Sequence, residues 1–323
     1  MNNITFDQLR KLTEDEAREM LETIRWPDGV VCPHCGSKYA HKLTPKGGTK
    51  TSVRPGVYFC GACRKQFTVM VGTIFEGSHI KIANWLMALY LMCSSKKGIS
   101  SHQLHRTLGV TYKTAWFMAH RIREAMSQRP LVDMLNGTVE ADEAYIGGKE
   151  KNKHANKRTK GTQGRSTKTK TPVAVLVERD GNSRATKVVS TDTKTLKENI
   201  RKNVNRSAKI MTDEHNAYNG LEDEFATHET VDHGRGEYVR GDVYTNTAES
   251  WIALLKRGLV GTFHHISEEH LNRYTDEFAF RWNHRKISDG ERTIEAIKGI
   301  EGKRLIYKDV VETDRLTFES IND

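Results

Sequence analysis

The chain has 323 residues, which is enough for two or three compact units. Its most apolar run, residues 82–93, is too short to cross a bilayer as a helix, and residues 1–20 lack the apolar stretch of a secretion signal, so we expect a cytoplasmic, nucleoid-associated protein with no membrane partner. The formal net charge of +10 indicates a polyanionic partner.

The first predicted elements are an amphipathic helix and a metal-binding ribbon. Apolar residues recur at helical spacing over residues 5–25. Two CxxC pairs follow, with 24 residues between them: Cys32, Cys35, Cys60 and Cys63. Four thiolates make a closed tetrahedral Zn²⁺ site, so the predicted zinc is structural. Gly36 and Gly61 are expected to let the backbone turn close to the sulfurs.

A helix-turn-helix is predicted after a buried helix over residues 80–93. Its first helix begins near Ser101, Gly109 supplies the turn, and Thr111 caps the second helix. The side chains of the second helix that we expect to be available to DNA are those of Lys113, Thr114, His120 and Arg121. An ordinary helical hairpin shows the same pattern, so plain packing of two helices is the alternative.

From Thr138 onward the sequence changes to short strands separated by turns, and then alternates helices with strands. This order predicts a mixed sheet covered by helices. Three acidic residues occupy informative places in it. Asp142 lies in the predicted strand 139–146, Asp213 follows the strand 208–212, and Glu249 lies in the next helix.

A basic segment directly follows the strand of Asp142. Residues 149–171 contain nine Lys or Arg and one Glu, a local charge of +8, which leaves only +2 for the rest of the chain. We expect this segment, including Lys157, Arg158 and Lys160, to contact DNA phosphates. The alternative is a solvated loop with no specific task.

Two strand-borne aspartates and a helix-borne glutamate can hold a pair of Mg²⁺ ions, because Mg²⁺ prefers oxygen ligands. Lys256 follows Glu249 by seven positions, two helical turns, so both side chains share a helix face. Side chains alternate along a strand, so the neighbouring Glu143 and Glu214 are expected to face away. Paired Mg²⁺ ions activate the attacking oxygen and stabilise the leaving oxygen of a phosphodiester. The sequence therefore predicts an enzyme that cuts and joins DNA.

In these motifs the sequence resembles the zinc-ribbon DDE transposases of the insertion-sequence 1595 family, whose catalytic domain has a ribonuclease H-like fold. The matching stretches run in family order from about Cys32 to Arg285. They are CPHCGS, YFCGACRKQFTVMVGTIFEGS, DEAYIGGK, TDEHNAY, and a long block from GEYVRGDVYTNTAESWIALLKRGLVGTFHHIS to HLNRYTDEFAFRWNHR.

The resemblance implies roles for individual residues. Asp142, Asp213 and Glu249 would bind two Mg²⁺ ions per active site, for which Mn²⁺ can substitute, and Lys256 would be the basic residue that follows the triad. Members of this group can have asparagine as the third ligand. Asn246, three residues before Glu249, therefore stays an alternative, although the seven-residue step to Lys256 favours Glu249.

Together these patterns predict a multidomain α+β, or mixed α/β, chain. Its expected parts are an N-terminal helix with a zinc ribbon (1–79), a helix-turn-helix (80–130), a ribonuclease H-like catalytic domain of mixed sheet and helices (137–290) and a C-terminal tail (291–323).

The predicted function is transposition. The ribbon and the helix-turn-helix would bind the terminal inverted repeats of a mobile element, while the catalytic domain cuts the strand end and joins its 3′-hydroxyl to target DNA. We expect a homo-oligomer assembled on the DNA ends. Two alternatives remain: a ribonuclease H-like nuclease without strand transfer, and a domesticated DNA-binding protein. The intact acidic triad argues against the second.

Overall fold

The computed structural model describes residues 4–44, 54–127, 133–148, 150–162 and 164–311. The chain forms two compact units. The first combines the residues up to Ser127 with those from Lys286 onward, and the second comprises the residues between them. No helix in the described ranges is long and apolar enough to cross a membrane.

The first unit begins with two helices rather than the single helix predicted over residues 5–25. These are α1 (Phe6–Lys11) and α2 (Glu14–Arg25). The break falls at Thr13, whose side chain accepts the backbone N–H of Glu16 while the Glu16 carboxylate accepts the backbone N–H of Thr13. This capping box starts a new helix in spite of the continuous apolar periodicity.

A small antiparallel sheet follows, and one of the four predicted zinc ligands, Cys60, ends its middle strand. Its strands lie in the order β1-β2-β3: β1 (Ala40–Lys42), β2 (Tyr58–Cys60) and β3 (Gln66–Phe67). Tyr58 and Phe67 are buried and their rings stack, and Trp26 at the end of α2 packs against both rings edge-on. An aromatic core therefore supports the ribbon.

The rest of the first unit is helical: α3 (Ile82–Ser94), α4 (Ser101–Leu108), α5 (Tyr112–Met126), α9 (Asp289–Lys298) and α10 (Tyr307–Val311). The predicted turn between α4 and α5 is present, with Gly109 in the left-handed conformation and Thr111 capping α5. Helix α9 packs against α2, α3 and α5, and a side chain at Gly290 would collide with the backbone of Ile4.

This packing differs from the predicted boundaries. The ribbon, the helix-turn-helix and residues 286–311 share one compact unit, because α9 buries its apolar residues Ala296 and Ile297 within it. Residues 312–323 of the predicted tail lie outside the described residues, as does Lys149 of the basic segment.

The second unit is a five-stranded mixed sheet in the order β6-β5-β4-β7-β8. Its elements are β4 (Thr138–Ile146), β5 (Thr171–Glu178), β6 (Ser183–Lys187), α6 (Thr193–Asn203), β7 (Lys209–Asp213), β8 (Thr227–Val231), α7 (Asn246–Gly258) and α8 (Leu271–Asn283). β4, β5 and β6 are antiparallel neighbours, whereas β4, β7 and β8 run parallel. The predicted fold class, a zinc ribbon followed by a ribonuclease H-like mixed sheet with helices, is confirmed.

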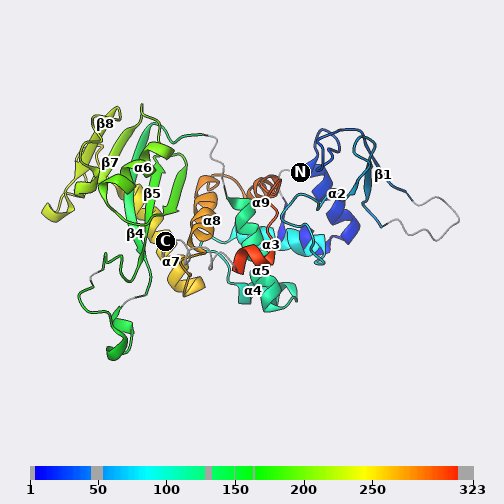
Figure 1. Ribbon diagram of the computed structural model, residues 1–323, viewed down its shortest axis with the longest axis horizontal. Helices are drawn as coiled ribbons and strands as arrows, with labels where there is room; N and C mark the ends of the chain where they lie inside the picture. Colours follow the sequence, from blue (N-terminus) through cyan, green and yellow to red (C-terminus); the bar gives the residue numbers. More distant parts are fainter. Residues whose placement is uncertain (1–3, 45–53, 128–132, 149, 163, 312–323) are drawn as a thin grey trace, which may run out of the picture. The chain divides into compact units, whose positions relative to one another are not determined.

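The two faces of this sheet have separate cores, one shared with α7 and α8 and the other with α6. Figure 1 shows these strands and helices. On β5, Val175 packs in the core that includes residues of α7 and α8, whereas the next residue, Leu176, packs with residues of α6. This alternation decides which residues of the neighbouring β4 can approach α7.

Candidate active site and zinc site

Asp142 and Asp213 lie on the same face of the sheet, the one covered by α7. Asp142 pairs with Val175, whose side chain belongs to the core under that helix. On the parallel neighbours β4 and β7, Glu140 pairs with Met211. Two residues further along each strand stand Asp142 and Asp213, so both carboxylates point the same way.

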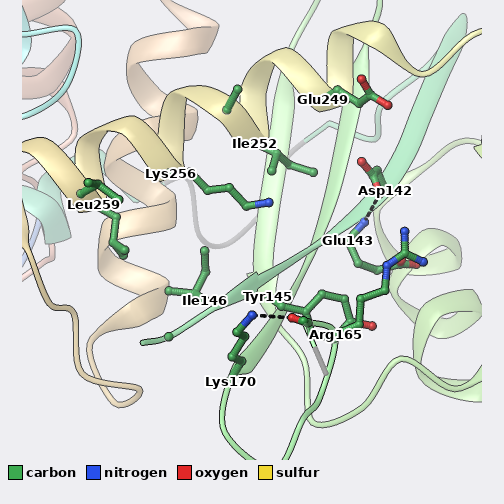
Figure 2. Close-up of a pocket in the computed structure, with 14 residues that line it drawn as sticks. Asp142, Glu143, Tyr145, Ile146, Arg165, Lys170, Glu249, Ile252, Lys256 and Leu259 are labelled. Atoms are coloured by element: carbon green, nitrogen blue, oxygen red, sulfur yellow. Dashed lines mark hydrogen bonds between the residues drawn. The ribbon is translucent and has the colours of Figure 1, made fainter. Parts of the chain in front are cut away.

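Helix α7 brings Glu249 over this face. Figure 2 shows Glu249 and Asp142 pointing toward one another, with Lys256 reaching into the same pocket from further along the helix. The pocket has a volume of about 640 Å³. Asp213 is not among its lining residues, but it lies close enough for its charge to act on Asp142. The structure thus gathers Asp142, Glu249 and Lys256 and places Asp213 beside them.

The pKa of Asp142 is raised from its ordinary value to about 7. Burial is the main cause, and a hydrogen bond of 2.7 Å donated by the backbone N–H of Glu143 opposes it. Repulsion from the carboxylates of Glu143, Asp213 and Glu249 adds to the rise. Carboxylates that repel one another at a partly buried site are stabilised by a bound dication, so these residues fit Mg²⁺.

The two acidic neighbours, Glu143 and Glu214, have hydrogen-bond partners of their own. Glu143 accepts a hydrogen bond from the hydroxyl of Tyr218, which belongs to the core on the α6 side of the sheet, although Glu143 also lines part of the pocket. The pKa of Glu143 is raised to about 7, chiefly by burial. Glu214 accepts the backbone N–H groups of His233 and Gly234 at 3.0 and 3.3 Å. Of these acids, Asp142 and Asp213 therefore face α7.

The four predicted zinc ligands form one cluster. Their Sγ atoms lie within 4.8 Å of one another, with 3.7 Å between Cys32 and Cys63 and 3.6 Å between Cys35 and Cys60. Zn–S bonds of about 2.3 Å in a tetrahedron put the sulfurs roughly 3.8 Å apart. Within the described part of the chain this is the one group of three or more His, Cys, Asp or Glu side chains whose ligand atoms lie this close together. The cluster fits a structural Zn²⁺.

Each CxxC pair lies in a tight backbone turn, and the two turns place different residue types in the left-handed conformation. In the first, Gly36 has a φ of +73° and donates its N–H to the carbonyl of Cys32. In the second, the equivalent left-handed residue is Arg64, with a φ of +58°, and not Gly61. Gly61 is needed for another reason, because a Cβ there would stand 2.1 Å from the ring of Tyr39.

Comparisons with known proteins agree with both sites. Residues 134–283 match the ISXO2-like transposase domain, and residues 12–66 match the transposase zinc-ribbon domain. The chain is also similar to an uncharacterized protein in transposable element ISH50 of Halobacterium salinarum. The two are 33% identical over 279 residues, which cover 84% of this chain and 91% of the relative.

The chain belongs to the insertion-sequence 1595 family of DDE transposases. It is thus a transposase of a mobile element, a member of an enzyme family that transfers nucleotidyl groups, and its partner is DNA. No solved structure matches it.

The two alternatives for the third ligand, Glu249 and Asn246, occupy different places in this transposase. Glu249 lines the pocket, and its charge acts on Asp142. Asn246 is the first residue of α7, is exposed, and does not line the pocket. The geometry supports Glu249.

The residues predicted to contact DNA fall into two groups. Lys113 and Thr114 lie in the first turn of α5, and Lys113 is exposed with its ammonium 4.7 Å from the ring centre of Tyr307. Arg121 is 4% exposed and donates hydrogen bonds of 2.8 Å to the carbonyls of Leu305 and Glu76. The prediction for Arg121 is wrong, and that for His120, with 0% exposed, is wrong too. The second half of α5 packs into the unit.

The basic segment behaves as an exposed surface over most of its described length. Lys157, Arg158 and Lys160 are all exposed. The guanidinium of Arg158 also donates to the carbonyls of Lys151 and Lys153. The charge pattern of the sequence therefore marks an exposed surface, and its contact with DNA phosphates stays a prediction.

Some residues near the site were not predicted to belong to it. Arg165 and Lys170 line the pocket on the side away from α7 (Figure 2). Both lie in the basic segment, so their charge is visible in the sequence. Only the fold shows that they lie near the acidic residues of the pocket. His233 lies in the turn before α7, with Nδ1 3.6 Å from Oε1 of Glu249, and nothing in the sequence marks that proximity.

Proposed function

We propose that this transposase cuts DNA at the ends of its mobile element and joins the freed 3′-hydroxyl to target DNA at a site formed by Asp142, Asp213 and Glu249. The observation that carries the proposal is the convergence of Asp142 and Glu249, from β4 and α7, on one pocket beside Asp213. Two bound Mg²⁺ ions would supply activation of the attacking oxygen and stabilisation of the leaving oxygen.

The pocket is lined by basic side chains as well as by acidic ones. Lys256 enters from α7, and Arg165 and Lys170 line the opposite side. Three cationic groups around acidic residues can neutralise the phosphodiester and hold its backbone while the acidic residues act on the reacting phosphate. The exposed Lys113 and the half-buried Thr114 at the start of α5, together with the ribbon, would bind the terminal repeats. The catalytic assembly would be a homo-oligomer on paired ends.

Purified protein incubated with a labelled element end provides the test. We expect Mg²⁺-dependent cleavage of the intact end, joining of a pre-cut end bearing a 3′-hydroxyl to a second DNA, and support of both reactions by Mn²⁺. Cleavage without joining would instead establish the nuclease alternative. Specific binding with neither reaction would establish a domesticated DNA-binding protein.

The basic segment is proposed to bind phosphates outside the pocket. Replacing Lys157, Arg158 and Lys160 together by Gln should weaken binding to all DNA sequences alike. Each lost phosphate contact lowers the steepness of log K against log salt by about 0.9, so the three changes together should lower it by up to about 2.7.

Fluorescence anisotropy over a salt series measures this slope. A matched control replaces three other exposed cations of the same unit, Lys202, Arg206 and Lys209, by Gln. An unchanged slope in the first variant, or an equal change in both, would mean that the segment is a solvated loop without a specific task.

A further inference from the structure

We propose that Glu140 and Arg179 form a positioning pair that sets the distance between Asp142 and Glu249. The inference rests on the proposed function, because it takes both carboxylates as metal ligands. Neither Glu140 nor Arg179 lines the pocket. Both act through the start of α7. Glu140 accepts hydrogen bonds from the first turn of this helix, and Arg179 donates hydrogen bonds to the segment that precedes it.

Glu140 is a wholly buried carboxylate, with 0% of its surface exposed. It lies on β4 two residues before Asp142, on the same face of the strand. Its oxygens accept hydrogen bonds from the backbone N–H of Thr247 at 2.7 Å, the Thr247 hydroxyl at 2.9 Å and the backbone N–H of Ala248 at 3.0 Å. A buried charge persists only when it is paired in this way.

These bonds replace the usual cap of α7. The residue before the helix, Thr245, makes no side-chain capping hydrogen bond. The first N–H groups of a helix have no partner within it, and here Glu140 supplies one from a different element. A negative charge at this end is also favoured by the helix dipole. The first turn of α7 is therefore held by β4.

Arg179 completes the attachment. It follows β5, and its Nε lies 2.7 Å from the Glu140 carboxylate. Its other two nitrogens donate to the carbonyls of Asp242 and Tyr244 at 2.7 and 2.9 Å, and the guanidinium lies 3.6 Å from the centre of the Tyr244 ring. One planar group thus holds both the carboxylate and the chain that leads into α7. Lysine could not reproduce this geometry.

The attachment is adjacent to both proposed ligands. Ala248, which bonds to Glu140, directly precedes Glu249, and Glu140 is separated from Asp142 by one residue. A shift of α7 against β4 would therefore change the Asp142 to Glu249 distance almost directly. A misplacement of about 1 Å can cost about a hundredfold in rate, so a positioning role predicts weaker metal binding in addition to any loss of stability.

Glu140→Gln in the full-length protein tests this role, since it keeps the shape and removes the charge. Binding of Mn²⁺ is measured from the electron paramagnetic resonance signal of the free ion. We expect affinity to fall about tenfold or more, as for loss of partners that orient metal ligands. The matched control is Glu224→Gln, which breaks a 2.6 Å pair with Arg201 in the same unit away from the pocket, and it should leave the affinity unchanged.

A double-mutant cycle distinguishes positioning from general support. In a Glu249→Gln background, adding Glu140→Gln should cost little further Mn²⁺ affinity, because the ligand that Glu140 positions is already lost. Equal losses in both backgrounds would overturn the proposal. So would a lower unfolding temperature with unchanged Mn²⁺ affinity, which is the result expected of a merely structural pair.

Thr247→Val covers the case in which Glu140→Gln does not fold. It removes one of the hydrogen bonds to Glu140 with little change of volume, and should weaken Mn²⁺ binding in the same direction by roughly threefold. Unchanged affinity in this variant contradicts the positioning role. Wild-type protein that binds Mn²⁺ but neither cuts nor joins DNA contradicts the proposed function and leaves the positioning pair standing. Wild-type protein that binds no Mn²⁺ overturns both.

Discussion

Asp142→Asn is expected to abolish Mg²⁺-dependent cleavage and joining while leaving the binding of element ends intact. The substitution keeps the shape of the side chain and removes a charge that a hard dication requires. Loss of several kcal/mol of charge stabilisation at the reacting phosphate corresponds to a rate at least about a thousandfold lower. Cleavage and joining are measured on labelled ends, and binding by anisotropy of the same DNA.

The same variant should be more stable than the wild type when Mg²⁺ is absent. The pKa of Asp142 is raised in the folded protein to about 7, so the fold disfavours the charged form. That cost appears as the pH rises from the unfolded value of 3.8 through 7, and asparagine does not incur it. Thermal unfolding at pH 8 in buffer free of Mg²⁺ checks the sign. Lower stability together with retained cleavage would remove Asp142 from the metal site.

Two substitutions on α7 serve as the comparison. Glu249→Gln should be as inactive as Asp142→Asn, because Glu249 lines the same pocket. Asn246→Ala should remain active, since Asn246 is exposed and outside the pocket lining. The reverse ranking would move the third ligand one turn back along the helix.

Loss of zinc should have the largest effect on the first unit. Cys63→Ser is expected to release the ion, unfold the ribbon and abolish specific binding to element ends, because structural zinc sites contribute about 10–16 kcal/mol of apparent binding energy to folding. Metal analysis of freshly purified wild type should give one zinc per chain. Circular dichroism and end binding report on the variant.

The fifth cysteine provides the control for this experiment. Cys93 is buried in α3 and lies outside the four-sulfur cluster, so Cys93→Ala should keep one zinc per chain and specific binding. Zinc lost equally from both variants would point to general unfolding rather than to ligand removal. A wild type without zinc would contradict the assignment outright.

Patterns of residues close together in the sequence were enough to predict many elements of the fold. The cysteine pairs, the helix-turn-helix with Gly109, and the order of strands around Asp142 and Asp213 all depend on residues close in sequence. The same reasoning put a single helix over residues 5–25, where the capping box at Thr13 breaks it. It also treated Arg121 as a surface cation, although the carbonyls that hold it belong to residues 76 and 305.

The positioning pair could not be found in this way. Glu140 stands in an apolar run beside Asp142, and its partners on α7 are 107 and 108 residues away. No local pattern marks a carboxylate that caps a distant helix. Alternation along the strand puts Glu140 and Asp142 on one face, but only the fold shows that this face lies beneath α7.

The discontinuity of the first unit has a consequence for the order in which the chain folds during synthesis. Residues up to Ser127 leave the ribosome early, but α9, which packs against α2, α3 and α5, is made only after the whole second unit. Domains generally fold as they emerge. We therefore expect the second unit to fold first, while the helices of the first unit stay incomplete until residues 286–311 follow. Translation that stops near residue 285 would then release a folded second unit with an incomplete first unit.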